Sequence, residues 1–309
     1  MGFLRFLEGL RTPFLDTLFS LITHLGEETV LILIGLIFYW CIDKKKGYYV
    51  LSVGFIGTII NQFLKLLFRV PRPWIKDPSF TIVESARAEA TGYSFPSGHT
   101  QTSVGLFGSI ALLYRKKKLL FTLCIIAAVL TSFSRLYLGV HTLLDVGVSI
   151  GLALLLIFGL YPLIMKAAES PKGMYIYLGS LLGVSVLYLL FVLLFPFPAD
   201  IDPENYASGV KNAYKILGCM LGLLLAYELD RRYIRFETDA TLLGQALKLL
   251  LGLIPILAIK EGLRAPLELL FNGSFAADGV RYFLICLVAG GVWPLTFPLI
   301  CRLTEKKKR

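Results

Sequence analysis

The stretch "SRLYLGVHTLLD", residues 134–145, joins two apolar runs, 119–138 and 142–165. Each run is long enough to cross a lipid bilayer, which takes about 20 predominantly apolar residues. Charged and ionisable side chains in such a setting are costly, and they point to a function. The stretch therefore predicts two membrane helices joined by a short turn, with an arginine, a histidine and an aspartate held beside that turn.

Similar apolar runs recur along the whole chain of 309 residues. The composition is 56% hydrophobic and 17% charged, with a mean hydropathy of +0.71, whereas an ordinary soluble domain has about 25% charged residues. The fold class predicted is all-α, a polytopic transmembrane helical bundle. Residues 3–23 are expected to form an amphipathic or marginally spanning helix. Further spans are expected near 25–42, 48–69, 98–114, 174–196, 209–228, 241–260 and 281–302.

The net charge of +10 falls in short clusters between the apolar runs. This pattern is typical of cytoplasmic loops, and nucleic acid is not expected as a partner. One set of alternating loops holds 17 basic residues and the other holds 8. The first set is Lys44–Lys46, Arg115–Lys118, Lys166, Lys172, Arg231, Arg232, Arg235, Arg302 and Lys306–Arg309. We expect this set and the C-terminus to face the cytoplasm, so that segment 70–97 and the turn 138–141 share the outer side.

Five cysteines are scattered singly, so neither a disulfide framework nor a metal site is expected from them. A cleavable signal peptide is not expected either, because Arg11, Pro13 and Asp16 interrupt the first apolar stretch.

The first polar block on the outer side is "KLLFRVPRP", residues 65–73. Lys65 and Arg72 are seven residues apart and would share one face of a helix, which Pro71 and Pro73 would end. Taken alone, the block could also be a pair of cations that anchor a helix end at the interface.

The second block is "YSFPSGHTQTS", residues 93–103. Pro96 and Ser97 predict a helix start. Free N–H groups at a helix N-terminus bind anions, and Gly98 would let a phosphoryl oxygen approach the backbone. His99 would then lie at the mouth of an anion site. An ordinary cap with an interfacial histidine is the alternative.

The third block is the opening stretch itself. His141 and Asp145 are i and i+4 residues, whose Cβ atoms lie ~5–6 Å apart on a helix. The carboxylate can hold one imidazole nitrogen as N–H, which leaves the other free as a nucleophile or base. Arg135 suits bidentate contact with phosphate oxygens. A buried structural hydrogen bond would explain the His141–Asp145 pair, but not the basic residues and the second histidine on the same side.

Together the three blocks resemble the tripartite motif of the type 2 phosphatidic acid phosphatase (lipid phosphate phosphatase) superfamily. The matching pattern is Lys65-x6-Arg72-Pro73, then Pro96-Ser97-Gly98-His99, then Ser134-Arg135-x5-His141-x3-Asp145. The resemblance covers roughly residues 1–166 and implies a six-helix phosphatase core there. Residues 167–309 lie outside it and are expected to form about four additional transmembrane helices.

The resemblance also implies roles for the matching residues. His141 would be the nucleophile that takes the phosphoryl group, with Asp145 orienting its ring. His99 would protonate the leaving oxygen and later activate water. The phosphoryl oxygens would be bound by Lys65, Arg72, Arg135, Ser97 and the Gly98 amide. Neither a metal nor another cofactor is implied.

The predicted function is therefore a membrane-embedded lipid phosphatase with its site on the outer side. Its partners would be the membrane and a lipid phosphate that enters from the bilayer: phosphatidate, phosphatidylglycerol phosphate or a polyprenyl diphosphate. A lipid phosphotransferase using the same phosphohistidine is one alternative, and a lipid transporter with a headgroup-binding polar cluster is another. Residues 174–302 could form a scaffold, a lipid pathway or the interface of a homo-oligomer.

Overall fold

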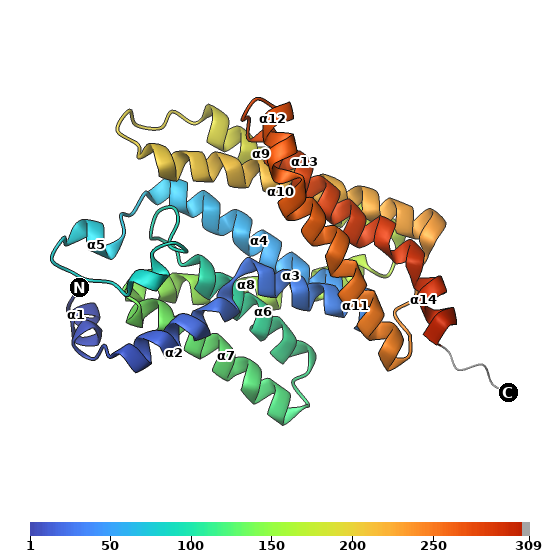
Figure 1. Ribbon diagram of the computed structural model, residues 1–309, viewed down its shortest axis with the longest axis horizontal. Helices are drawn as coiled ribbons and strands as arrows, with labels where there is room; N and C mark the ends of the chain where they lie inside the picture. Colours follow the sequence, from blue (N-terminus) through green and yellow to red (C-terminus); the bar gives the residue numbers. More distant parts are fainter. Residues whose placement is uncertain (305–309) are drawn as a thin grey trace. The chain divides into compact units, whose positions relative to one another are not determined.

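The structure is a computed structural model that describes residues 1–304, and every regular element in that part of the chain is helical (Figure 1). Seven helical stretches are long and apolar enough to cross a membrane. They are Lys44–Lys76, Lys118–Tyr137, Leu143–Ala167, Pro171–Leu194, Pro203–Ile234, Leu242–Gly262 and Ala276–Thr304. The predicted all-α, polytopic membrane bundle is confirmed. The basic residues Lys306–Arg309, which entered the orientation argument, lie outside the described part.

The main helices follow one another with short connections, apart from one long loop between α5 and α6. In the front half they are α1 (Gly2–Gly9), α2 (Pro13–Thr23), α3 (Glu28–Ile37), α4 (Lys44–Phe68), α5 (Pro73–Lys76), α6 (Gly98–Leu113), α7 (Lys118–Tyr137) and α8 (Leu143–Ala167). In the back half they are α9 (Pro171–Leu194), α10 (Pro203–Leu229), α11 (Leu242–Leu257), α12 (Arg264–Leu270), α13 (Ala276–Leu287) and α14 (Phe297–Thr304).

By their contacts the residues divide into two compact units. The first comprises residues 1–34, 49–163 and 197–209, and it holds all three polar blocks. The second comprises residues 35–48, 164–196 and 210–309. The boundary expected near residue 166 stays a prediction.

The single helix predicted over residues 3–23 is wrong, because the structure has two helices there. α1 ends at Gly9 and α2 begins at Pro13. Thr12 caps α2, since its hydroxyl accepts a hydrogen bond from the amide of Leu15 at 3.4 Å. Proline is favoured in a first turn, where its missing N–H costs nothing, but it would break the interior of a longer helix.

The span predicted over residues 25–42 begins later than expected, at Glu28, and α3 then continues to Ile42 through the π-helical turn η2 (Phe38–Ile42). A short 3₁₀ turn, η1 (His24–Gly26), follows α2, and α3 then leaves at an angle of 51° between Pro13–Gly26 and Glu28–Ile42. The residue at the break, Glu27, has an extended backbone (φ −75°, ψ 150°). Taken together, Pro13–Gly26 and Glu28–Ile42 are long and apolar enough to form an eighth span.

The helix predicted over 98–114 is present as α6, but its 16 residues fall short of a full span. At 1.5 Å per residue α6 is about 24 Å long, against about 30 Å for the hydrocarbon core. Ten of its residues are buried and they lie on all of its sides, from Thr100 to Ala111. α6 is therefore an inner helix of its unit, surrounded by protein.

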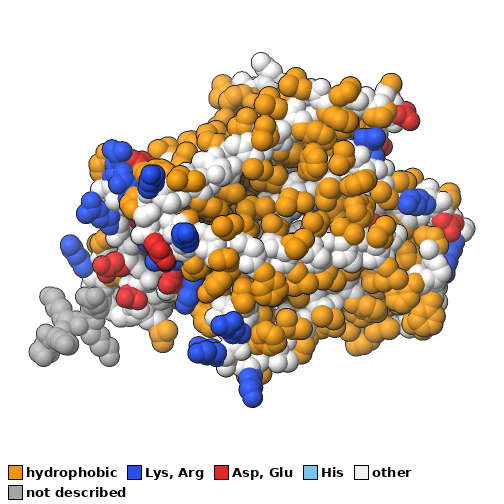
Figure 2. Space-filling model, turned by 180° about the vertical axis from the view of Figure 1, so that it is seen from behind, with side chains coloured by type: hydrophobic (Ala, Val, Ile, Leu, Met, Phe, Trp, Pro, Cys, Tyr) orange, Lys and Arg blue, Asp and Glu red, His pale blue; other side chains and the backbone are white. Residues whose placement is uncertain are grey.

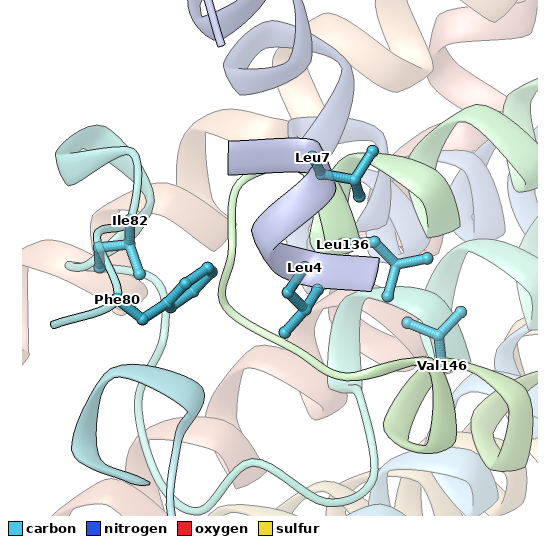
Figure 3. Close-up of a cluster of buried hydrophobic side chains, with 6 residues drawn as sticks. All are labelled: Leu4, Leu7, Phe80, Ile82, Leu136 and Val146. Atoms are coloured by element: carbon cyan, nitrogen blue, oxygen red, sulfur yellow. The ribbon is translucent and has the colours of Figure 1, made fainter. Parts of the chain in front are cut away.

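α1 is amphipathic and packs one face against the loop that follows α5. Leu4 and Leu7 lie in a buried cluster (Figure 3). The other members are Phe80, Ile82, Leu136 and Val146. The opposite face of α1 leaves Phe6 62% exposed.

The helices leave many apolar side chains on the surface. On the face shown in Figure 2, hydrophobic side chains cover most of the area and charged ones are few among them. Leu155 of α8 and Leu187 of α9, for example, are 72% and 66% exposed. An apolar surface of this kind is typical of helices whose outer faces contact lipid.

The second unit buries one lysine completely. Lys248 of α11 is 0% exposed, and its Nζ donates to the carbonyl of Thr238 at 3.1 Å. The same ammonium lies 4.7 Å from the ring centre of Phe297, a cation–π contact. Lys248 therefore contacts both the loop before α11, through Thr238, and α14, through Phe297.

Candidate active site

The third polar block forms a tight turn between α7 and α8. Arg135 lies in the last turn of α7 and is fully buried. Its carbonyl accepts the amide N–H groups of Val140 and His141, at 3.2 and 3.3 Å. Gly139 takes the left-handed conformation (φ +82°) that such a turn requires. The turn therefore holds the His141 backbone directly against Arg135.

His141 is 2% exposed and contacts a cation on one side and a carboxylate on the other. Arg72 Nη1 lies 3.0 Å from His141 Nε2. Since a guanidinium has only donors, Nε2 accepts, and the proton of the neutral ring belongs on Nδ1. Nδ1 lies 3.6 Å from Asp145 Oδ2, which is beyond ordinary hydrogen-bond length.

Burial and the Arg72 guanidinium hold the pKa of His141 well below its ordinary value, although Asp145 acts in the opposite direction. Removal from water disfavours the imidazolium, and a nearby cation disfavours it further. At neutral pH the ring is therefore neutral, and Nε2 carries an unprotonated lone pair that accepts from Arg72.

Asp145 is fixed by the polypeptide around it. Its Oδ2 accepts the Ser94 hydroxyl and the amide of Thr142, both at 2.7 Å. The Asp145 carbonyl accepts the amide of Ser97 at 3.2 Å. The second and third polar blocks are thus joined through this residue.

Arg72 is held by main-chain carbonyls. Its Nε donates to Gly92 at 3.1 Å, Nη2 donates to Thr91 at 2.8 Å, and Nη1 donates to Val140 at 3.0 Å. Lys65 likewise donates from Nζ to the carbonyl of Tyr93. The first block is thereby attached to the loop before α6 and to the turn that carries His141.

The second block starts α6 as predicted. Ser97 is the N-cap, and its hydroxyl accepts the amide of Thr100 at 3.4 Å. A methyl group placed on Gly98 would meet only Asn61 Oδ1, at 3.7 Å, so the backbone there is open to a close approach. His99 Nε2 is buried and has no hydrogen-bond partner in the described part of the chain. That nitrogen is free to serve a ligand.

All eight predicted site residues lie in the first unit, and the charge among them is unbalanced. Lys65, Arg72 and Arg135 are three buried cations, against the single carboxylate of Asp145. Such a surplus suits a phosphoryl group with two negative charges. Within residues 1–304, no three His, Cys, Asp or Glu side chains are grouped so that they could hold a metal ion.

Sequence reasoning missed three residues that support the site. Ser94 donates to Asp145, and Ser149 donates to the Ser97 carbonyl at 2.9 Å. Asn61 Nδ2 donates to the carbonyl of Pro96 at 3.3 Å. Helical spacing offered a signal for two of them, since Ser149 is four residues after Asp145 and Asn61 is four residues before Lys65.

Comparison with protein families gives two matches that together cover much of the chain. The model described as "PAP2 superfamily" matches residues 46–169. A second, "PAP2 superfamily phosphatase, transmembrane extension", matches residues 214–306. The first range includes all eight predicted site residues, and the second lies in the back half.

Curated relatives match as well. Phosphatidylglycerophosphatase B of Bacillus subtilis is 32% identical over 161 residues, which are 48% of this chain and 75% of that protein. An undecaprenyl-diphosphatase of the same organism is 34% identical over 116 residues, or 38% of this chain. Sphingosine-1-phosphate phosphatase 1 of Mus musculus is 25% identical over 294 residues, or 93% of this chain.

The last two alignments span 56% and 62% of the relatives' own lengths, less than two thirds in each case. No solved structure matches the chain significantly.

Proposed function

Since this chain belongs to the PAP2 superfamily, a family of membrane lipid phosphatases, we propose that it hydrolyses a lipid phosphate monoester or diphosphate through a phosphohistidine at His141. The observation that carries the proposal is the state of that imidazole. It is buried and neutral, its Nε2 accepts from Arg72 at 3.0 Å, and its Nδ1 faces Asp145. A nucleophile needs this combination of an unprotonated nitrogen and an oriented ring.

In the first step, His141 Nε2 attacks the phosphorus atom. The P–N bond forms as the bond between phosphorus and the lipid oxygen breaks. His99 enters this step as an imidazolium, a form that the bound phosphate anion favours, and donates its proton to that leaving oxygen. Arg72 turns its N–H from Nε2 to a phosphoryl oxygen. The proton on Nδ1 stays in place, and the positive charge that develops on the ring is stabilised by Asp145.

In the second step, water attacks the same phosphorus atom. His99, now neutral, takes a proton from the water, the P–Nε2 bond breaks, and inorganic phosphate leaves. The electron pair of that bond returns to Nε2, so the imidazole is again neutral and ready for another substrate.

The phosphoryl oxygens are bound by cations and by one helix end. Lys65, Arg72 and Arg135 supply positive charge, while Ser97 and the Gly98 amide donate from the start of α6. Three buried cations around one anion supply the charge stabilisation that a metal ion gives in other phosphatases, and metal independence is part of the proposal. Activity that survives EDTA would support this point.

The substrate classes proposed are phosphatidate, phosphatidylglycerol phosphate and polyprenyl diphosphates. The relatives support this range, because their names cover a glycerophospholipid phosphatase, a polyprenyl diphosphatase and a sphingolipid phosphatase. The basic-residue asymmetry of 17 against 8 supports a site on the extracytoplasmic side and a cytoplasmic C-terminus.

The test is phosphate release by the purified full chain in detergent, with water as the only acceptor and a panel of lipid mono- and diphosphates. We expect release from at least one lipid, an acid-labile labelled adduct on the wild type, and loss of both in His141→Ala. Thr17→Val is the control, because Thr17 is exposed, lies outside the site and donates only to the carbonyl of Pro13. Near-normal release by His141→Ala would overturn the proposal, and release only when a second lipid or sugar acceptor is added would identify a phosphotransferase.

A further inference from the structure

The bend between α2 and α3 lies directly against the site. Thr23, the last residue of α2, is 4% exposed, and its Oγ1 accepts a hydrogen bond from Arg135 Nη1 at 2.6 Å. Residue 23 lies outside the range of the PAP2 match, which begins at residue 46. A segment that the family match does not include therefore contacts one of the cations proposed to bind phosphate.

This contact leaves the rest of the Arg135 guanidinium unpaired. Arg135 is 0% exposed, yet its Nε and Nη2 have no hydrogen-bond partner among residues 1–304. Leaving a buried charged donor unpaired is costly, so these two nitrogens call for an anionic ligand. Nε and one terminal nitrogen of a guanidinium form the fork that binds two oxygens of a phosphate.

The same bend also packs against His99. A methyl group added to Gly26 would lie 2.8 Å from the carbonyl oxygen of His99 and 2.9 Å from Thr131 Cγ2. Such distances are shorter than van der Waals contact, so only glycine fits there. The segment from Thr23 to Gly26 is thus seated between the helix that carries Arg135 and the helix that carries His99.

Packing between α2 and α7 does not need the Thr23–Arg135 hydrogen bond. The ring of Phe19 meets that of Phe133 edge to face and lies tilted against that of Tyr137, with ring centres 5.4 and 4.5 Å apart. Asp16 accepts the hydroxyl of Tyr137 at 2.8 Å. Because these contacts already join the two helices, we expect loss of the Thr23 hydroxyl to change the orientation of the Arg135 guanidinium and not the packing of α2 against α7.

We propose that Thr23 is a positioning residue for the reaction: its hydroxyl holds Nη1 of Arg135 so that Nε and Nη2 face the phosphoryl oxygens. The proposal rests on the proposed function, because it takes the phosphoryl group as the ligand of Arg135. It adds the α2–α3 bend to the phosphate site as the element that sets the angle of this guanidinium.

The experiment measures inhibition by inorganic phosphate, together with kcat, KM and the midpoint of thermal unfolding, on the full chain in detergent. Thr23→Val removes the hydroxyl and keeps the side-chain shape, and Thr23→Ser keeps the hydroxyl. Thr17→Val is the matched control on the same helix, because Thr17 is exposed and donates only to the carbonyl of Pro13. Thr23→Ala serves as the second hydroxyl-free variant if Thr23→Val does not fold.

We expect Thr23→Val to weaken phosphate binding about 10-fold, the effect of losing one hydrogen bond to a charged group. Thr23→Ser should stay within about threefold of the wild type, and Thr17→Val should not differ from it. In an Arg135→Gln background the further effect of Thr23→Val should fall below about twofold, because the hydroxyl acts through the arginine.

Three results would overturn the proposal: unchanged phosphate binding in Thr23→Val or Thr23→Ala, an equal loss in Thr23→Ser, or the same effect with and without Arg135. The wild type and Arg135→Gln distinguish failure of this proposal from failure of the proposed function. If the wild type releases no phosphate from any lipid, the proposed function is wrong. If the wild type is active and Arg135→Gln impairs phosphate release while Thr23→Val does not, only the role of Thr23 is wrong.

Discussion

Arg72 donates a hydrogen bond from Nη1 to Nε2 of His141 across 3.0 Å, so a cation contacts the nitrogen that we propose as the nucleophile. The contact keeps Nε2 unprotonated and determines which ring nitrogen carries the proton. It also means that the incoming phosphoryl group has to attract this guanidinium N–H before Nε2 can attack.

The first prediction concerns pH. Burial and Arg72 lower the pKa of His141 below its ordinary value of about 6.5. A lowered pKa means that the ring is neutral at every pH above that lower value, so kcat/KM should not fall as the pH drops through about 6.5. The acid limb of the profile should lie at lower pH, and Arg72→Gln should move it upward. A wild-type acid limb centred near 6.5 would contradict the assignment.

The second prediction concerns Asp145. Asp145→Asn should lower kcat by at least about 100-fold, because the charge that stabilises the imidazolium is lost. Inhibition by inorganic phosphate should change less than about threefold, since Asp145 is not proposed to contact the phosphoryl oxygens. Ser94→Ala is the control: it keeps the carboxylate and removes one of its hydrogen bonds, so its loss of kcat should be about 10-fold or less. Equal losses in both variants would argue against an electrostatic role.

The third prediction concerns the turn that carries His141. Gly139 has φ +82°, and an added methyl would lie 2.6 Å from Arg11 Nη2 and 3.0 Å from the Phe80 ring. Gly139→Ala should therefore lower both the unfolding temperature and kcat, with a backbone cost alone of about 1–2 kcal/mol. Gly147→Ala, on α8 with nothing near its added methyl, should leave both values unchanged or raise stability slightly. A Gly139→Ala enzyme with wild-type kcat would show that the turn tolerates movement.

The fourth prediction concerns Lys248 and the role of the second unit. Lys248→Met removes a buried ammonium that donates to the Thr238 carbonyl and lies over Phe297. We expect a lower unfolding midpoint in detergent and a kcat within about threefold of the wild type, as for a scaffold. Leu250→Met, 64% exposed on the same helix, is the control and should change neither. Loss of kcat without loss of stability would instead give this unit a part in the reaction.

The helices and the three polar blocks could be predicted from the sequence, because both depend on local patterns of residues. Apolar runs of about 20 residues predict spans whatever their neighbours are. The shared membrane side of the segment 70–97 and the turn 138–141 follows from counting spans between them. In the structure, Arg72 and His141, which come from these two segments, are in contact.

The contacts that the sequence did not predict are all long-range. Thr23 and Arg135 are 112 residues apart, and Ser94 and Asp145 are 51 apart. No periodicity connects such pairs, since each depends on how the helices pack. The break at Thr12–Pro13 did carry a local signal, a capping residue followed by proline, but the apolar residues on both sides favoured one continuous helix.

α1 has one further consequence, which follows from its two faces. Phe3 and Phe6 are 41% and 62% exposed, whereas Arg5 and Glu8 bind the loop after α5 through Asp77 and Thr81. A short amphipathic helix of this kind lies along the boundary between headgroups and acyl chains. Because α1 is bound to that loop, we expect the depth of α1 at this boundary to determine how far the proposed phosphate site lies from the headgroups.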